Sequence, residues 1–72
     1  MERLERGVCE VSGLPFSFQA GSPFVPSLDR RDNALGYTPE NTQLVVFLYN
    51  TCKSAGTHDD VMRLCEALCR TP

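Results

Sequence analysis

Hydrophobic residues gather in the second half of the chain, where the longest apolar run covers residues 42–50 (TQLVVFLYN). Its first four residues are typical of a strand. The rest favours a helix to Lys53, because four residues recur at i, i+3, i+4 and i+7: Val46, Tyr49, Asn50 and Lys53. Gly56 offers a C-cap for that helix. We therefore expect a strand over residues 42–45 and a helix over residues 46–53.

The clearest predicted element is a helix over residues 58–70. Thr57 can cap its first turn, and Asp60 completes a capping box three residues later. One stripe of this helix is apolar and contains Val61, Leu64, Cys65 and Leu68, with Cys69 beside it. We expect this C-terminal helix to pack through its stripe against the rest of the protein.

The first half of the chain is richer in turn formers. Residues 1–8 are polar and predict a short helix or an arm, whereas residues 9–18 predict two extended pieces joined at a turn. Residues 27–30 favour a short strand, and residues 31–41 a wide loop. We expect Tyr37 to anchor that loop. Both Tyr37 and Phe47 are predicted to lie in the core. The elements predict a small α+β fold in a single domain over residues 1–72.

Composition and charge exclude some classes of protein. The 72 residues are 42% hydrophobic, with seven basic and nine acidic side chains, a net charge of −2. This negative net charge does not favour a protein that binds duplex DNA by electrostatic attraction alone. No apolar run approaches the ~20 residues of a membrane span. Residues 1–6 lack the apolar region of a signal peptide, so we expect a cytoplasmic protein without a membrane partner.

The four cysteines favour a structural role as small apolar side chains. They form no Cys-x-x-Cys pair, and two of them stand four residues apart on the predicted C-terminal helix. We therefore expect buried thiols. A zinc site shared by all four stays open as the alternative, since four thiolates suffice for zinc. The cysteines are Cys9, Cys52, Cys65 and Cys69.

The most distinctive motif is the segment 26–53, PSLDRRDNALGYTPENTQLVVFLYNTCK. It resembles the core of the HNH, or His-Me finger, endonucleases, and more narrowly a phage-associated type of HNH-like protein. The positions that match are Ser27, Leu28, Asp29, Arg30, Asp32, Gly36, Tyr37 and Asn41, followed by Asn50-x-x-Lys53. Cys9-x-x-Ser12-Gly13 is similar to the family's first zinc knuckle, so the resemblance covers residues 9–53.

The resemblance implies a ββα-metal-finger-like centre, with an N-terminal hairpin before it and the C-terminal helix after it. In that family, one divalent cation such as Mg²⁺ is held against a scissile phosphate of nucleic acid. Carried over to this chain, the likeness makes Asp29 and Asn50 the metal ligands and Asn41 the residue that fixes the catalytic loop. It makes Arg30, Arg31 and Lys53 contacts to nucleic acid.

This chain departs from the family pattern at its most reactive position. Arg30 stands where the family has its general-base histidine, and a guanidinium cannot act as a base because it stays protonated. As a catalytic residue, Arg30 could still hold a phosphate or stabilise charge in the transition state. The only histidine, His58, lies outside the motif, and we expect it to be exposed. Three family cysteines are replaced by Ser12, Val46 and Tyr49, so we expect no structural zinc and a core enlarged by Val46 and Tyr49.

Two functional hypotheses follow. The first is a divalent-cation-dependent endonuclease that hydrolyses DNA with Arg30 in the base position. The second is a catalytically inactive HNH-like protein that binds nucleic acid or a protein, for example a phage-encoded inhibitor of a host defence or of a nucleic-acid-processing complex. A homodimer is compatible with both, since apolar residues are numerous around Phe16, Phe18, Phe24 and Val25.

Each site residue also has a plain structural alternative. Asp29 can form a salt bridge, Arg30 can pair with Asp32 or stack on Tyr37, and Asn41 can simply close its loop. Lys53 can be a solvated lysine in the last turn of its helix, and Asn50 can cap backbone groups or simply face water.

Overall fold

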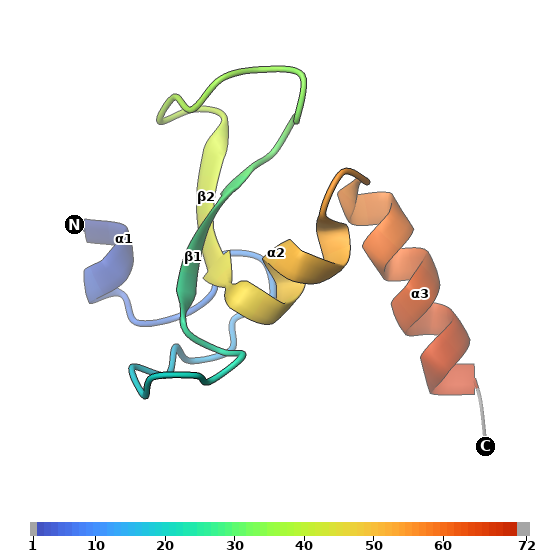
Figure 1. The fold of residues 1–72 in the computed structure, drawn as a ribbon, viewed down its shortest axis with the longest axis horizontal. Helices are drawn as coiled ribbons and strands as arrows, with labels where there is room; N and C mark the ends of the chain where they lie inside the picture. Colours follow the sequence, from blue (N-terminus) through green and yellow to red (C-terminus); the bar gives the residue numbers. More distant parts are fainter. Residues whose placement is uncertain (1, 71–72) are drawn as a thin grey trace.

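The computed structural model describes residues 2–70. In chain order its elements are α1 (Glu2–Glu5), β1 (Pro26–Arg30), β2 (Thr42–Val46), α2 (Phe47–Lys53) and α3 (His58–Arg70) (Figure 1). The α+β prediction is confirmed, because an antiparallel hairpin is followed directly by helices. None of the helices in the described part of the chain is long and apolar enough to cross a membrane.

The two strands form the centre of the molecule. β1 and β2 pair antiparallel, with Pro26 opposite Val46, Leu28 opposite Leu44 and Arg30 opposite Thr42. β-Branched residues suit a strand because their side chains pack well on a pleated surface. Val45 and Val46 at the end of β2 are accordingly buried. The apolar run turns into α2 at Phe47, so one continuous segment supplies both the inner strand and the helix.

The N-terminal segment closes the core from the side of β2. Val8 and Pro15 form an antiparallel bridge, and Gly13 makes the turn between them with a positive φ of 77°. The Glu10 amide donates to the carbonyl of Leu44 (2.9 Å), which attaches this turn to the free edge of β2. The core beneath contains Cys9, Phe16, Val45 and Val46, with Val11, Leu44 and Tyr49 packed around it. The expected enlargement of the core by Val46 and Tyr49 is therefore present.

A capping box starts α3 where the sequence predicts it. The Thr57 amide donates to Oδ2 of Asp60 (2.9 Å), and the Asp60 amide donates to Oγ1 of Thr57 (3.2 Å). Gly56 precedes the box because a Cβ there would lie 2.8 Å from Oδ2 of Asp60. The residue with positive φ that ends α2 is Ser54 (φ 45°), not the predicted Gly56.

The expectation that α3 packs along its whole apolar stripe is wrong. Only Val61 in its first turns is buried, whereas Leu64 and Leu68 are exposed, Leu68 by 64%. Figure 1 shows why, since α3 meets the end of α2 and then leads away from the hairpin. Tyr37 (66% exposed) and Phe47 (50% exposed) are also outside the core that the sequence predicts for them.

The thiols are not uniformly buried. Cys9 lies in the core, but Cys52, Cys65 and Cys69 are exposed, so the expectation of buried thiols holds for Cys9 alone. Within residues 2–70, no three His, Cys, Asp or Glu side chains come together as a metal site requires. This arrangement does not assemble the shared four-cysteine site that the sequence left open.

A candidate nucleic-acid interface at the end of the hairpin

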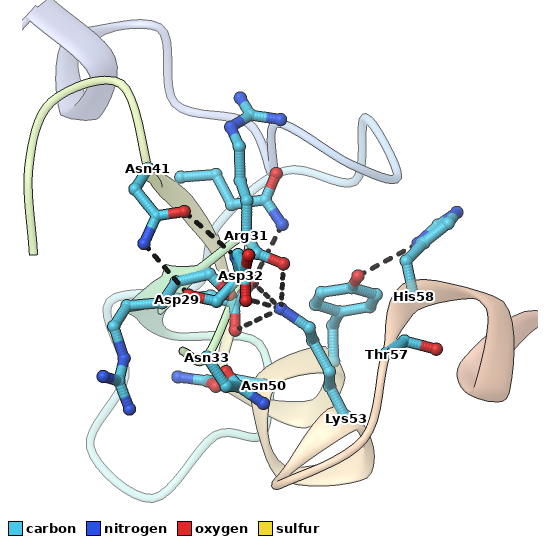
Figure 2. A network of polar contacts seen from close by, with 12 residues as sticks. Asp29, Arg31, Asp32, Asn33, Asn41, Asn50, Lys53, Thr57 and His58 are labelled. Carbon is cyan, nitrogen blue, oxygen red and sulfur yellow. Dashed lines mark hydrogen bonds and ion pairs between the residues drawn. The ribbon is translucent and has the colours of Figure 1, made fainter. Parts of the chain in front are cut away.

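A buried ion pair lies at the end of β1. Nζ of Lys53, from the last turn of α2, is 3.0 Å from Oδ2 and 3.2 Å from Oδ1 of Asp29. Asp29 is only 4% exposed and Lys53 only 3%. The Gln43 amide donates to the same carboxylate (2.9 Å), and Lys53 also donates to the carbonyls of Arg30 and Arg31. Figure 2 shows the dashed contacts of Lys53 converging on its ammonium group beside Asp29.

The ion pair determines what Asp29 can bind. Both carboxylate oxygens already accept from Lys53, so the negative charge that would attract a cation is compensated from within the protein. The amide of Asn50, the other predicted ligand, faces β1 and donates to Oγ of Ser27 (2.7 Å) and to the carbonyl of Leu28 (3.1 Å). As placed, these two residues do not fit a divalent cation, and their role as its ligands stays a prediction.

Lys53 is likewise placed differently from the phosphate contact that the resemblance implies. Its ammonium is turned inward and has carboxylate and carbonyl oxygens as partners. Burying a charged group is costly unless it is paired and hydrogen-bonded, and Lys53 is both. Lys53 therefore ties α2 to the end of β1, and a phosphate could reach it only if the ion pair opened.

Asn41 holds the loop between the strands in shape. Its Oδ1 accepts from the Asp32 amide (3.0 Å), while its Nδ2 donates to the carbonyls of Asp32 (3.1 Å) and Gly36 (2.9 Å). One buried side chain thus satisfies three backbone groups of a loop that has no ladder of its own. This is the loop-closing role expected from the sequence, and the catalytic assignment of Asn41 stays a prediction.

Arg30 and Arg31 follow one another where β1 ends. The Arg30 guanidinium lies 4.9 Å from the centroid of the Tyr37 ring and donates to the carbonyl of Leu35 (3.2 Å). The stacking that the sequence offers as an alternative for Arg30 is therefore present. Arg31 is exposed, and so is the Tyr37 ring. The end of the hairpin consequently presents positive charge beside an accessible aromatic face.

Two further groups near this end are not predicted from the sequence. Arg3 of α1 reaches the hairpin, with Nη1 donating to Oγ1 of Thr42 (3.1 Å) and Nη2 to the carbonyl of Pro39 (2.9 Å). His58 lies against α2, where its Nδ1 is 3.0 Å from the Tyr49 hydroxyl. No spacing in the sequence signals either contact, because each depends on how distant segments dock.

Two groups in the core cluster, Tyr49 and Cys9, have shifted pKa values. Burial, and then the charge of Asp29, raise the pKa of Tyr49, so its hydroxyl keeps its proton. Burial would raise the pKa of the Cys9 thiol, but hydrogen bonds with Ser12 and with nearby backbone groups outweigh burial and lower it.

Comparisons of the chain with protein-family models, with curated proteins and with solved structures find no match.

Proposed function

We propose that this chain is an HNH-like domain that binds nucleic acid at the end of its hairpin and needs no divalent cation to do so. The observation that carries this proposal is the buried ion pair between Lys53 and Asp29. The resemblance makes Asp29 a metal ligand, and the ammonium of Lys53 supplies the positive charge beside its carboxylate. The domain thereby keeps the ββα arrangement without a free carboxylate for a cation.

The neighbouring side chains support binding. Arginine presents a planar set of donors that matches phosphate oxygens, and two arginines, Arg30 and Arg31, follow one another in the sequence where β1 ends. An exposed aromatic ring such as that of Tyr37 can stack an unpaired base of any sequence. Two or three phosphate contacts predict weak binding that is sensitive to salt, as the net charge of −2 also implies.

Hydrolysis has less support at this position. A general base must accept a proton, and Arg30 carries a guanidinium that is stacked and hydrogen-bonded. A cation that polarised the phosphate would have to compete with Lys53 for Asp29. Cation-dependent cleavage of DNA is nevertheless the second candidate, because the order of the elements and the loop contacts of Asn41 suit an HNH-like centre.

Fluorescence anisotropy tests the proposal with a labelled oligonucleotide of about 12 nucleotides, a length within the range of single-strand sites. We expect saturable binding at low salt that is the same in Mg²⁺ and in EDTA and is weakened by Arg30→Gln. Arg70→Ala is the matched control, since it removes an exposed arginine from the last turn of α3 and not from the end of the hairpin. Absence of binding would overturn the proposal and would favour a protein partner instead.

Gel analysis of the same mixtures separates binding from cleavage. We expect the oligonucleotide to be recovered intact with Mg²⁺ or Mn²⁺. Fragments that require the cation and disappear in Asp29→Ala would establish the second candidate.

A further inference from the structure

Two hollows on the surface share a wall formed by Glu10 and Arg31. The first, of about 510 Å³, has Arg3, Arg6, Val8 and Cys9 as its other lining residues. The second, of about 330 Å³, is completed by Val11, Gln43, Lys53 and His58. The lining comes from the N-terminal segment, from Arg31 directly after β1, from β2 and from α2 and α3. Segments far apart in the sequence thus build one depression beside the end of β1.

The charge in this depression is unevenly compensated. Lys53 is paired with Asp29, and Nε of Arg3 is 3.4 Å from Oε2 of Glu10, the only acidic residue of the lining. Among the ion pairs of the described residues, none involves Arg6 or Arg31, and both side chains are exposed. Two guanidinium groups are therefore left to attract an anion. The fork of donors on each suits the oxygens of a phosphate.

His58, which lines the second hollow, adds a hydrogen-bond donor. The Tyr49 hydroxyl lies 3.0 Å from its Nδ1 and retains its proton. When that hydroxyl donates to Nδ1, the neutral imidazole carries its own proton on Nε2. The ring then has an N–H available for a phosphate oxygen. Arg6, Arg31 and His58 thus lie along the depression as three separate donors.

We propose that this depression, the arginine groove, binds successive phosphates of a single-stranded nucleic acid. The groove is defined by Arg3, Arg6, Glu10, Arg31 and His58. A single strand fits the observations better than a duplex, because the donors line a concave surface that can follow one flexible backbone. The inference rests on the proposed function and extends its interface from the hairpin to α1 and α3.

The test compares Arg6→Ala and His58→Ala with wild type in anisotropy titrations of labelled single-stranded DNA in EDTA. We expect each variant to weaken binding by about three- to tenfold. Arg6→Ala should also lower the slope of log affinity against log salt by about 0.7, the value for one phosphate contact on a single strand. Arg63→Ala, an exposed arginine of α3 outside the groove, should leave affinity unchanged. Circular dichroism confirms that each variant is folded.

The outcomes separate this inference from the function on which it rests. Wild-type affinity in both Arg6→Ala and His58→Ala, together with weak binding in Arg30→Gln, would overturn the groove and leave the proposed function standing. Equal affinity for the matching duplex would overturn the single-strand assignment. Competition by inorganic phosphate as strong as that by the oligonucleotide would assign the groove to a free anion instead. Loss of all binding in the wild type would overturn both proposals.

Discussion

The ammonium nitrogen of Lys53 lies 3.0 Å from Oδ2 of Asp29, and both side chains are almost completely buried. The two residues are 24 positions apart, so this contact joins the end of α2 to the end of β1. The Gln43 amide donates a further hydrogen bond to Asp29, and Lys53 donates to two backbone carbonyls. The pair therefore holds the hairpin to its helix at the place where the HNH resemblance implies a metal.

Removing Lys53 should destabilise the protein strongly. Lys53→Met leaves the Asp29 carboxylate buried without a counter-charge, and we expect a loss of about 3–5 kcal/mol in the free energy of unfolding. Urea unfolding followed by circular dichroism measures this change. The double variant with Asp29→Asn should lose less than Lys53→Met alone, because no bare charge remains. A loss below about 1 kcal/mol for Lys53→Met would show that the pair is not buried in solution.

The loop between the strands should depend on a single amide. Asn41→Ala removes three hydrogen bonds to the backbone of Asp32 and Gly36, and we expect a loss of about 1.5–4.5 kcal/mol at the usual 0.5–1.5 kcal/mol for each bond. Urea unfolding again provides the value. Glu40→Ala, at the exposed neighbouring position, should stay within about 0.5 kcal/mol of wild type. Equal effects of the two substitutions would contradict the role given to Asn41.

Divalent cations should not stabilise the wild-type protein. Since Lys53 already compensates Asp29, we expect the same thermal midpoint in Mg²⁺, in Mn²⁺ and in EDTA. In Lys53→Met the carboxylate is released, so Mn²⁺ should raise the midpoint of the variant as a ligand that binds only the folded state. Thermal scans followed by circular dichroism test both statements. A cation-dependent rise in wild type would show that the metal displaces the lysine.

The thiols should fall into two classes of reactivity. Cys52, Cys65 and Cys69 are exposed, and we expect these three to react rapidly with a thiol reagent under native conditions. Cys9 lies in the core, so its reaction should wait for unfolding even though hydrogen bonds lower its pKa. Counting labelled thiols by mass spectrometry before and after adding urea gives the result. Rapid labelling of four thiols in the native protein would contradict the core described above.

Local signals in the sequence identify the elements well. The capping box of Thr57 and Asp60 depends only on neighbouring residues, and the helix from 58 to 70 begins and ends as predicted. β2 extends one residue beyond its predicted end, because Val46 continues the apolar run of the strand before α2 begins. A capping residue and a run of β-branched side chains act within a few positions, so a single sequence is enough to interpret them.

The contacts that define the site are long-range, and the sequence does not show them. Nothing near Lys53 distinguishes a buried lysine from a solvated one, since its partner Asp29 is 24 residues away. Arg3 likewise contacts Thr42 and Pro39, which lie 39 and 36 residues further along the chain. The exposure of the apolar stripe of α3 cannot be predicted for a similar reason. Periodicity predicts an apolar face but does not show what covers it. The homodimer, expected from the apolar residues around Phe16, Phe18, Phe24 and Val25, stays a prediction.

The most direct measurement of the central claim is one anisotropy titration of single-stranded DNA, made in parallel with Mg²⁺ and with EDTA. The account predicts the same saturable binding in both, with the DNA recovered intact and the affinity reduced in Arg30→Gln. It would be contradicted by the absence of binding, or by cleavage that requires the cation and the Asp29 carboxylate.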